Sequence, residues 1–234
     1  MIKELRKELK KFADPKKAKF LERYFKNGKG EYAEGDIFLG ISVPVARRIA
    51  IKNSNISLKE VSYLLKSKIH EERFIALEIL VHKFDKSDSD IEKENIYEFY
   101  LSNTAKINNW DLVDTSAEYI LGDYLSNKDK SVLYNLAKSS NLWERRIAII
   151  STFHFIKNNN FKDTLKISEL LLKDKHDLIH KAVGWMLREV GKRDKNVLED
   201  FLSKYYNQMP RTMLRYAIEK FPENIRKQYL KGEI

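Results

Sequence analysis

The sequence contains no cysteine, and this absence excludes several kinds of chemistry. Disulfide bonds, thiolate-bound zinc, iron–sulfur clusters and thiol nucleophiles all require cysteine. A chain without cysteine suits a reducing compartment, and we expect a cytoplasmic protein. The amino terminus, MIKELRKELKKFADPKKAKF, is basic and amphipathic but lacks the uninterrupted apolar segment of a secretory signal. No export is therefore expected.

Long apolar runs and helix breakers are also rare. No segment approaches the roughly 18 apolar residues of a membrane-spanning helix, so we expect no membrane association. The chain has only 8 glycines and 4 prolines. The prolines stand near expected helix starts, at Pro15, Pro44, Pro210 and Pro222.

Metal-binding motifs are missing too. The five histidines form no H-E-x-x-H motif, although His176 and His180 are spaced i, i+4. Lone surface histidines are far commoner than metal ligands, so we predict no metal site at this pair.

Apolar residues recur at i, i+3, i+4 and i+7 in nearly every segment between turn signals. One such helical face contains Ile75, Leu77, Ile79, Leu80 and Phe84. Alternating strand patterns are missing. We predict about a dozen helices joined by short polar turns, for example at residues 87–89 and 158–160.

Several of these helices resemble one another, because each places a small residue within an apolar turn: Ala76, Ala117, Ala148, Gly184 and Ala217. The spacing of roughly 31 to 41 residues is close to the period of HEAT-type helix pairs. We therefore predict an all-α fold, an α-solenoid of HEAT-like repeats that forms one domain over residues 1–234 and presents a concave face. The alternative is that small residues merely mark close helix crossings in another all-α fold.

Residues 28–36 break the helical pattern with three glycines, Gly28, Gly30 and Gly35. A phosphate-cradling loop is possible, but no GxxxxGK[ST] or GxGxxG motif is present. Two glutamates and an aspartate in the segment would also repel phosphate. A plain connecting loop is the favoured interpretation.

Basic residues outnumber acidic ones, 44 to 34, which gives a formal net charge of +10 and a pI near 9.4. Such an excess favours a polyanionic partner through counterion release and electrostatic steering. We therefore expect nucleic acid as the partner, ahead of a membrane surface.

The most informative stretch is INNWDLVD, residues 107–114. Asn108 or Asn109 can cap a helix whose first turn contains Asp111. Trp110 and Asp114 are spaced i, i+4 and therefore share a helix face. The residues alone favour a plainer interpretation, with Trp110 in the core and Asp114 as a surface charge or local hydrogen-bond acceptor.

Two further segments pair a tryptophan with an arginine three residues later, Trp143 with Arg146 and Trp185 with Arg188. Arginine grips phosphate while an indole packs against sugar or base, so these pairs suit nucleic-acid binding. They equally suit an ordinary core, with the arginines solvated or in salt bridges.

Several motifs together resemble the DNA alkylation repair family, the HEAT-like-repeat alkylpurine DNA glycosylases. They are AEGDIFLGI (33–41), NNWDLVD (108–114), LWERRIAI (142–149), HKAVGWMLRE (180–189) and PRTMLRYAIEKFP (210–222). The resemblance covers nearly the whole chain. It implies binding of double-stranded DNA that contains alkylated purines and cleavage of their N-glycosidic bonds, with no metal or organic cofactor and without flipping the lesion into a deep pocket. We expect a monomer associated with the nucleoid.

The resemblance also implies roles for particular residues. Trp110 and Asp114 correspond to the catalytic aromatic and carboxylate of the family, and Arg146 to its phosphate-binding arginine. Trp185 corresponds to the second aromatic of the pocket, and Arg188 on the same motif is a further candidate DNA contact. Tyr24 resembles the N-terminal pocket tyrosine, although a role as a core aromatic has equal weight.

Two other functions remain open at this point. The same scaffold can bind DNA structures without catalysis, although Trp110, Asp114, Arg146 and Trp185 occurring together argues against this alternative. A HEAT-type protein-interaction scaffold with a basic groove is the other alternative, and its partners would be acidic proteins.

Overall fold

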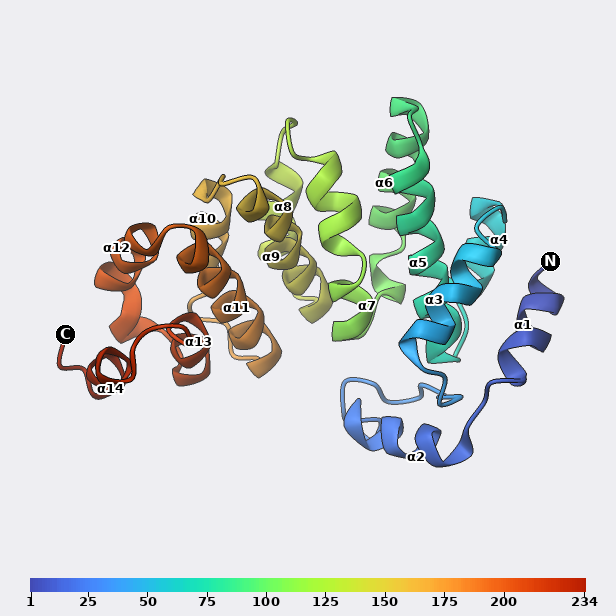
Figure 1. Cartoon of the computed structure of the whole chain (residues 1–234), viewed down its shortest axis with the longest axis horizontal. Helices are drawn as coiled ribbons and strands as arrows, with labels where there is room; N and C mark the ends of the chain where they lie inside the picture. Colours follow the sequence, from blue (N-terminus) through green and yellow to red (C-terminus); the bar gives the residue numbers. More distant parts are fainter. The chain divides into compact units, whose positions relative to one another are not determined.

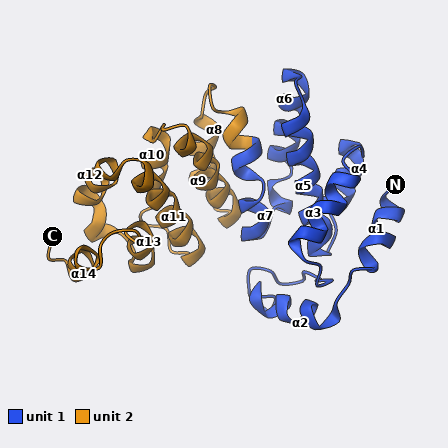
Figure 2. Cartoon of the chain, viewed as in Figure 1, with its two compact units in different colours: residues 1–120 blue, residues 121–234 orange.

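The computed structural model describes all 234 residues and contains fourteen α-helices and no β-strand (Figure 1). The all-helical prediction is confirmed. The chain divides into two compact units, residues 1–120 and 121–234 (Figure 2). None of the helices combines the length and apolar character needed to cross a bilayer.

Unit 1 holds the first seven α-helices and one short 3₁₀ helix. They are α1 (Ile2–Lys10), α2 (Pro15–Tyr24), α3 (Val43–Lys52), α4 (Leu58–Leu65), α5 (His70–Lys86), α6 (Asp90–Ser102), the 3₁₀ helix η1 (Thr104–Lys106) and α7 (Trp110–Asp114). A π-helical turn, η2 (Glu118–Gly122), follows α7.

Unit 2 holds the remaining seven α-helices. They are α8 (Ser131–Ala137), α9 (Leu142–Lys157), α10 (Lys162–Leu170), α11 (Asp177–Arg193), α12 (Lys195–Tyr205), the 3₁₀ helix η3 (Tyr206–Gln208), α13 (Arg211–Ala217) and α14 (Glu223–Lys231).

The prolines stand at helix starts, as the sequence predicts. Pro15 and Pro44 lie within the first two positions of α2 and α3, and Pro210 and Pro222 are the N-caps of α13 and α14. Proline suits these positions because its φ is preset and the missing N–H has no helical partner there.

Helix α5 is the centre of unit 1. It packs against α3, α4, α6 and α7, and side chains on nearly every side of it are buried. A helix that is apolar all round belongs in the interior of a domain. Its first turn is nevertheless His70-Glu-Glu-Arg73, and all four of these polar residues are buried, so the core of unit 1 begins with a charged cluster.

Unit 2 is built from stacked helix pairs. Helices α8 and α9, α10 and α11, and α12 and α13 follow one another, and α9 packs against α11, which packs against α13. This arrangement confirms helical repeats. Gly184 also marks a close crossing, because a Cβ atom there would lie 2.5 Å from the Met213 carbonyl oxygen. The recurring small residues therefore indicate both repeated helix pairs and close helix crossings.

The glycine-rich segment 28–36 is a connecting loop between α2 and α3. Glutamate side chains within the loop accept hydrogen bonds from its backbone amides. The N–H of Gly28 donates to Glu31 at 2.7 Å, and the N–H of Gly30 donates to Glu34 at 2.8 Å. Directly after the loop, Ile37 forms a single parallel β-bridge with Ile69, next to the start of α5. The prediction of a connecting loop is confirmed.

Candidate functional site

Helix α7 is a single turn held in place by capping. The Asn109 side chain accepts the Trp110 N–H at 2.8 Å, and Asn109 itself is buried. The Asp111 carboxylate accepts the Leu112 N–H at 2.9 Å. A helix this short has no independent stability, so its position depends on such local bonds and on packing. The predicted cap and the shared face of Trp110 and Asp114 are confirmed.

Trp110 packs on the core and also reaches a cavity. Its indole stacks on Phe25, with ring centroids 5.2 Å apart, and meets the edge of Tyr24 at 5.9 Å. The cavity measures 290 Å³, and its walls include Tyr24, Phe25, Phe74 and Trp110. Aromatic walls of this kind attract cations through the negative faces of the rings.

Tyr24 is 54% exposed, so the alternative that placed it in the core is wrong. It lies at the carboxyl end of α2, where it stacks on Phe20 with centroids 5.9 Å apart. Its neighbour Phe25 takes the buried position in the core cluster with Phe38. Sequence alone did not distinguish the two adjacent rings, because helical periodicity is weak at the end of a helix.

Asp114, the last residue of α7, is half-buried. Burial raises the pKa of the nearby Tyr100 hydroxyl, and the negative charge of Asp114 raises it further. The Tyr100 hydroxyl and the Ser116 hydroxyl are 2.9 Å apart, and the Ser116 hydroxyl donates to the Leu112 carbonyl at 2.6 Å. These buried hydrogen bonds stabilise the carboxyl end of α7, where Asp114 lies.

A buried charged network lies behind Trp110. His70 Nε2 is 2.7 Å from Asp111, and its Nδ1 is 3.3 Å from Asp36. Arg73 donates to the same Asp36 oxygen at 2.5 Å. Burial alone would lower the pKa of His70, but the charge of Asp111 and hydrogen bonds to Asp111 and Asp36 outweigh it and raise the pKa to about 9. His70 is therefore an imidazolium at neutral pH.

Sequence analysis missed this network. The members come from the loop before α3, from α5 and from α7, and the contacts between these segments join residues 34 to 41 positions apart in the chain. One signal was available, because His70-Glu-Glu-Arg73 directly precedes an apolar run. Four polar residues opening a buried helix indicate partners elsewhere in the fold.

Glu71 holds the segment that contributes Ile41 to the cavity wall. Its carboxylate accepts N–H groups from Leu39 at 3.0 Å, Gly40 at 2.8 Å and Ile41 at 3.2 Å. Gly40 has φ +80, and a Cβ atom there would lie 2.2 Å from the Asp14 carbonyl oxygen. Only glycine fits this close approach, which joins the loop to the start of α2.

Arg146 of unit 2 is 5% exposed. Its guanidinium donates to the Leu178 carbonyl at 2.6 Å. Of the two alternatives for this side chain, solvated or in a salt bridge, the solvated one is therefore wrong. Trp143, three residues earlier, is also buried and belongs to the core. The Asn141 side chain caps the start of α9 and accepts the Trp143 N–H at 2.9 Å.

Trp185 and Arg188 lie on α11 and are both half-buried. The Trp185 ring meets the edge of Phe153 with centroids 5.7 Å apart. Arg188 forms ion pairs with Glu189 and Glu219, which confirms the salt-bridged alternative for this residue. Its charge is therefore partly compensated within the protein.

His176 and His180, the i, i+4 pair, have hydrogen-bonding roles at the start of α11. The His176 ring accepts the Leu178 N–H at 3.2 Å and caps the helix, and the His180 ring is 2.5 Å from the Asp174 carbonyl oxygen.

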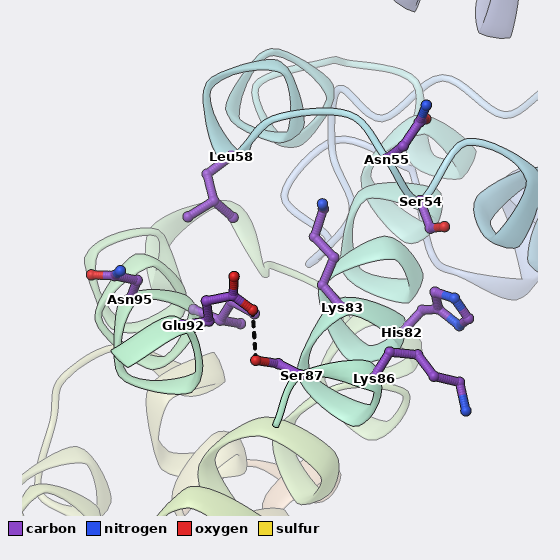
Figure 3. A pocket seen from close by; sticks show the side chains of 10 residues that line it. Ser54, Asn55, Leu58, His82, Lys83, Lys86, Ser87, Glu92 and Asn95 are labelled. Carbon is purple, nitrogen blue, oxygen red and sulfur yellow. Dashed lines mark hydrogen bonds between the residues drawn. The ribbon is translucent and has the colours of Figure 1, made fainter. Parts of the chain in front are cut away.

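A second cavity of unit 1, of 410 Å³, lies at the other end of α5 (Figure 3). Its lining mixes charges of both signs, with Lys83 and Lys86 on α5 and Glu92 on α6. The Ser87 hydroxyl donates to Glu92 at 2.7 Å. Because its polar side chains partly compensate one another, this cavity differs in character from the aromatic cavity beside Trp110.

The fold and these sites define an all-α helical-repeat protein with an aromatic cavity and an excess of positive charge. Residues 5–221 match the family of DNA alkylation repair enzymes, and the chain belongs to this family. Membership indicates a DNA substrate and a role in the repair of alkylated DNA. No curated protein matches the chain.

Three solved structures share the fold. A predicted DNA alkylation repair enzyme from Enterococcus faecalis has a TM-score of 0.68 at 16% identity, over 90% of this chain and 97% of that one. AlkD2 from Streptococcus mutans has a TM-score of 0.57 at 16% identity, over 87% and 99%. The protein smu.31 from Streptococcus mutans UA159 has a TM-score of 0.51 at 17% identity, over 97% and 99%.

Proposed function

We propose that the protein is a DNA glycosylase that hydrolyses the N-glycosidic bond of N3- and N7-alkylated purines in duplex DNA and leaves an abasic site. One observation carries the proposal: Trp110 lines an aromatic cavity and shares a face of α7 with Asp114, in a chain of the DNA alkylation repair family. The net charge of +10 supports a polyanionic substrate.

The substrate chemistry explains why this residue set suffices. A purine alkylated at N3 or N7 is cationic and leaves readily, so the electron pair of the C1′–N9 bond passes to the base without a general acid. Water then forms the new bond to C1′ and gives up a proton. No metal or organic cofactor is needed for these steps, because the leaving group is already activated.

Trp110 and Asp114 would stabilise the positive charge that develops on the sugar. The Asp114 carboxylate acts on this charge electrostatically and orients the attacking water. The face of the Trp110 indole attracts the cationic base and sugar, with a cation–π energy of roughly 0.5 to 2 kcal/mol. A single carboxylate is enough here, unlike the paired acids of sugar-polymer glycosidases.

Arg146, Trp185, Arg188 and Tyr24 would contact the DNA. The exposed ring of Tyr24 next to Trp110 suits this role. Arg188 would exchange its partner Glu219, whose side chain is 41% exposed, for a phosphate. Arg146 already donates a hydrogen bond to the Leu178 carbonyl and would donate further hydrogen bonds to a phosphate. Because the Leu178 bond orients the guanidinium before DNA binds, Arg146 would hold the phosphate in one position.

The test is to incubate the protein with methylated duplex DNA and to identify the released bases by chromatography. We expect 3-methyladenine and 7-methylguanine, with an equal number of new abasic sites. Binding of the DNA without release would instead favour the non-catalytic DNA-binding alternative. Failure to bind DNA at all would favour the protein-interaction scaffold.

A further inference from the structure

Helix α2 carries two exposed aromatic rings one turn apart. Phe20 is 58% exposed, Tyr24 is also mostly exposed, and the two rings stack with an interplanar angle of 18°. A single exposed aromatic side chain is ordinary, but contiguous exposed apolar surface marks an interaction site. The flat outer face of Phe20 is therefore available to another planar group.

These rings continue inward to the proposed catalytic site. Beyond Phe20 and Tyr24 comes Trp110, whose plane lies at 70° to that of Tyr24, and then Phe25, stacked on Trp110. The four rings thus form a connected series from solvent to the wall of the aromatic cavity. A planar ligand at Phe20 would lie at the outer end of this series.

The charges around Phe20 indicate the chemistry of the partner. Lys16, Lys19 and Arg23 are exposed on the same helix and form no ion pair within the chain, whereas α2 has only one acidic residue, Glu22. Lys16 lies one helical turn before Phe20, on the same stripe. Aromatic faces alternating with free cations fit a polymer of planar bases and phosphates.

We propose that Phe20, backed by Tyr24, is a stacking platform for a nucleobase displaced from the DNA duplex. Bases within a duplex have both faces covered by their neighbours, so only a base that has left the stack presents a face to a protein ring. The inference rests on the DNA binding of the proposed function but requires no catalysis.

The experiment uses undamaged duplex DNA with a single bulged 2-aminopurine, a base whose fluorescence falls when it stacks. We expect the wild-type protein to quench this probe and to prefer the bulged duplex over a fully paired one. Phe20→Ala should weaken binding to the bulged duplex by about fivefold to a hundredfold and leave binding to the paired duplex unchanged. Phe20→Trp should retain quenching.

A matched control is available in Tyr63→Ala. Tyr63 is also about half exposed, near Lys59 and Lys66, but it lies on α4, away from α2 in Figure 1. Its substitution should leave both duplexes bound as before. Phe20 is exposed, so its substitution does not open the core, and circular dichroism verifies the fold of each variant.

Two results would overturn the platform. One is equal quenching by wild type and Phe20→Ala. The other is an effect of Phe20→Ala on self-association in sedimentation, with DNA binding unaltered, which would make α2 a contact between copies. Release of methylated bases is measured in a separate assay. The stacking platform can therefore be refuted while glycosylase activity is present, and absence of glycosylase activity does not change the fluorescence result.

Discussion

The imidazole of His70 and the carboxylate of Asp111 are 2.7 Å apart and connect the first turn of the central helix α5 to the one-turn helix α7. Asp111 directly follows Trp110, so the ion pair fixes the helix turn that carries the proposed catalytic residues. The His70 ring also stacks on Phe38, and its centroid lies 5.0 Å from the ring centroid of Phe25. Its protonation state therefore matters to the whole site.

Stability should fall as pH rises from about 6.5 towards 9. His70 has a raised pKa in the folded state, about 9 against 6.5, under the influence of Asp111, Asp36 and the opposing Arg73. Its contribution is fully present below 6.5 and is lost as pH rises through 9. The shift corresponds to about 3 kcal/mol.

Urea unfolding at a series of pH values measures this effect. The His70→Gln variant should be less stable at pH 6.5 and should lack most of the decline between pH 6.5 and 9. Parallel curves for wild type and variant would show that His70 does not titrate in this range. The His70 Cε1–H resonance in NMR gives its pKa directly.

Asp114→Asn should reduce base release on the order of 10²- to 10³-fold while DNA affinity remains nearly unchanged. The carboxylate acts on charge that develops in the transition state, whereas binding depends mainly on phosphate contacts. Single-turnover release of 7-methylguanine and filter binding measure the two quantities. Wild-type excision by the variant would refute the assignment of Asp114.

Binding to undamaged duplex should weaken steeply with salt, and Arg146→Ala should reduce the slope by about one phosphate contact. Because Arg146 is buried, thermal unfolding must confirm that the variant is folded at the assay temperature. Lys86→Ala, at the polar cavity on the far end of α5, is the matched loss of a positive charge. An identical slope for both variants would argue against a special role of Arg146.

Cationic lesions should be released much faster than neutral ones. Trp110 and Asp114 stabilise positive charge but donate no proton to a leaving base. The imidazolium of His70 on the cavity wall already directs its two ring nitrogens at Asp36 and Asp111. Hypoxanthine and ethenoadenine should therefore leave far more slowly than 7-methylguanine and 3-methyladenine at saturating enzyme. If the lesion stays stacked in the duplex, extra bulk on its alkyl group should change the rate little. Comparable rates for hypoxanthine and 7-methylguanine would require a general acid.

Gly40→Ala should destabilise unit 1 more than Gly30→Ala does. The two glycines have nearly equal φ, +80 and +79, but a Cβ at Gly40 would collide with the Asp14 carbonyl, whereas nothing lies within 4 Å at Gly30. We expect about 1 kcal/mol for Gly30→Ala and at least about 3 kcal/mol for Gly40→Ala. Denaturant unfolding of the two variants measures the difference, and equal losses would mean that the loop relaxes.

The sequence by itself determined the helices and their starts. The prolines at Pro15 and Pro210, the cap at Asn109 and the shared face of Trp110 and Asp114 all depend on residues within a few positions of one another. Local backbone geometry and hydrogen bonding fix such features, so a periodic pattern is enough to predict them.

The tertiary structure alone decided which side chains are buried and which distant charges meet. Tyr24 turned out to be exposed and Arg146 buried, because burial depends on what packs against each helix end. His70, Asp36 and Asp111 come from separate segments and meet only when α5 and α7 pack together. Electrostatic interactions depend on distance in space, and a linear pattern does not contain that distance.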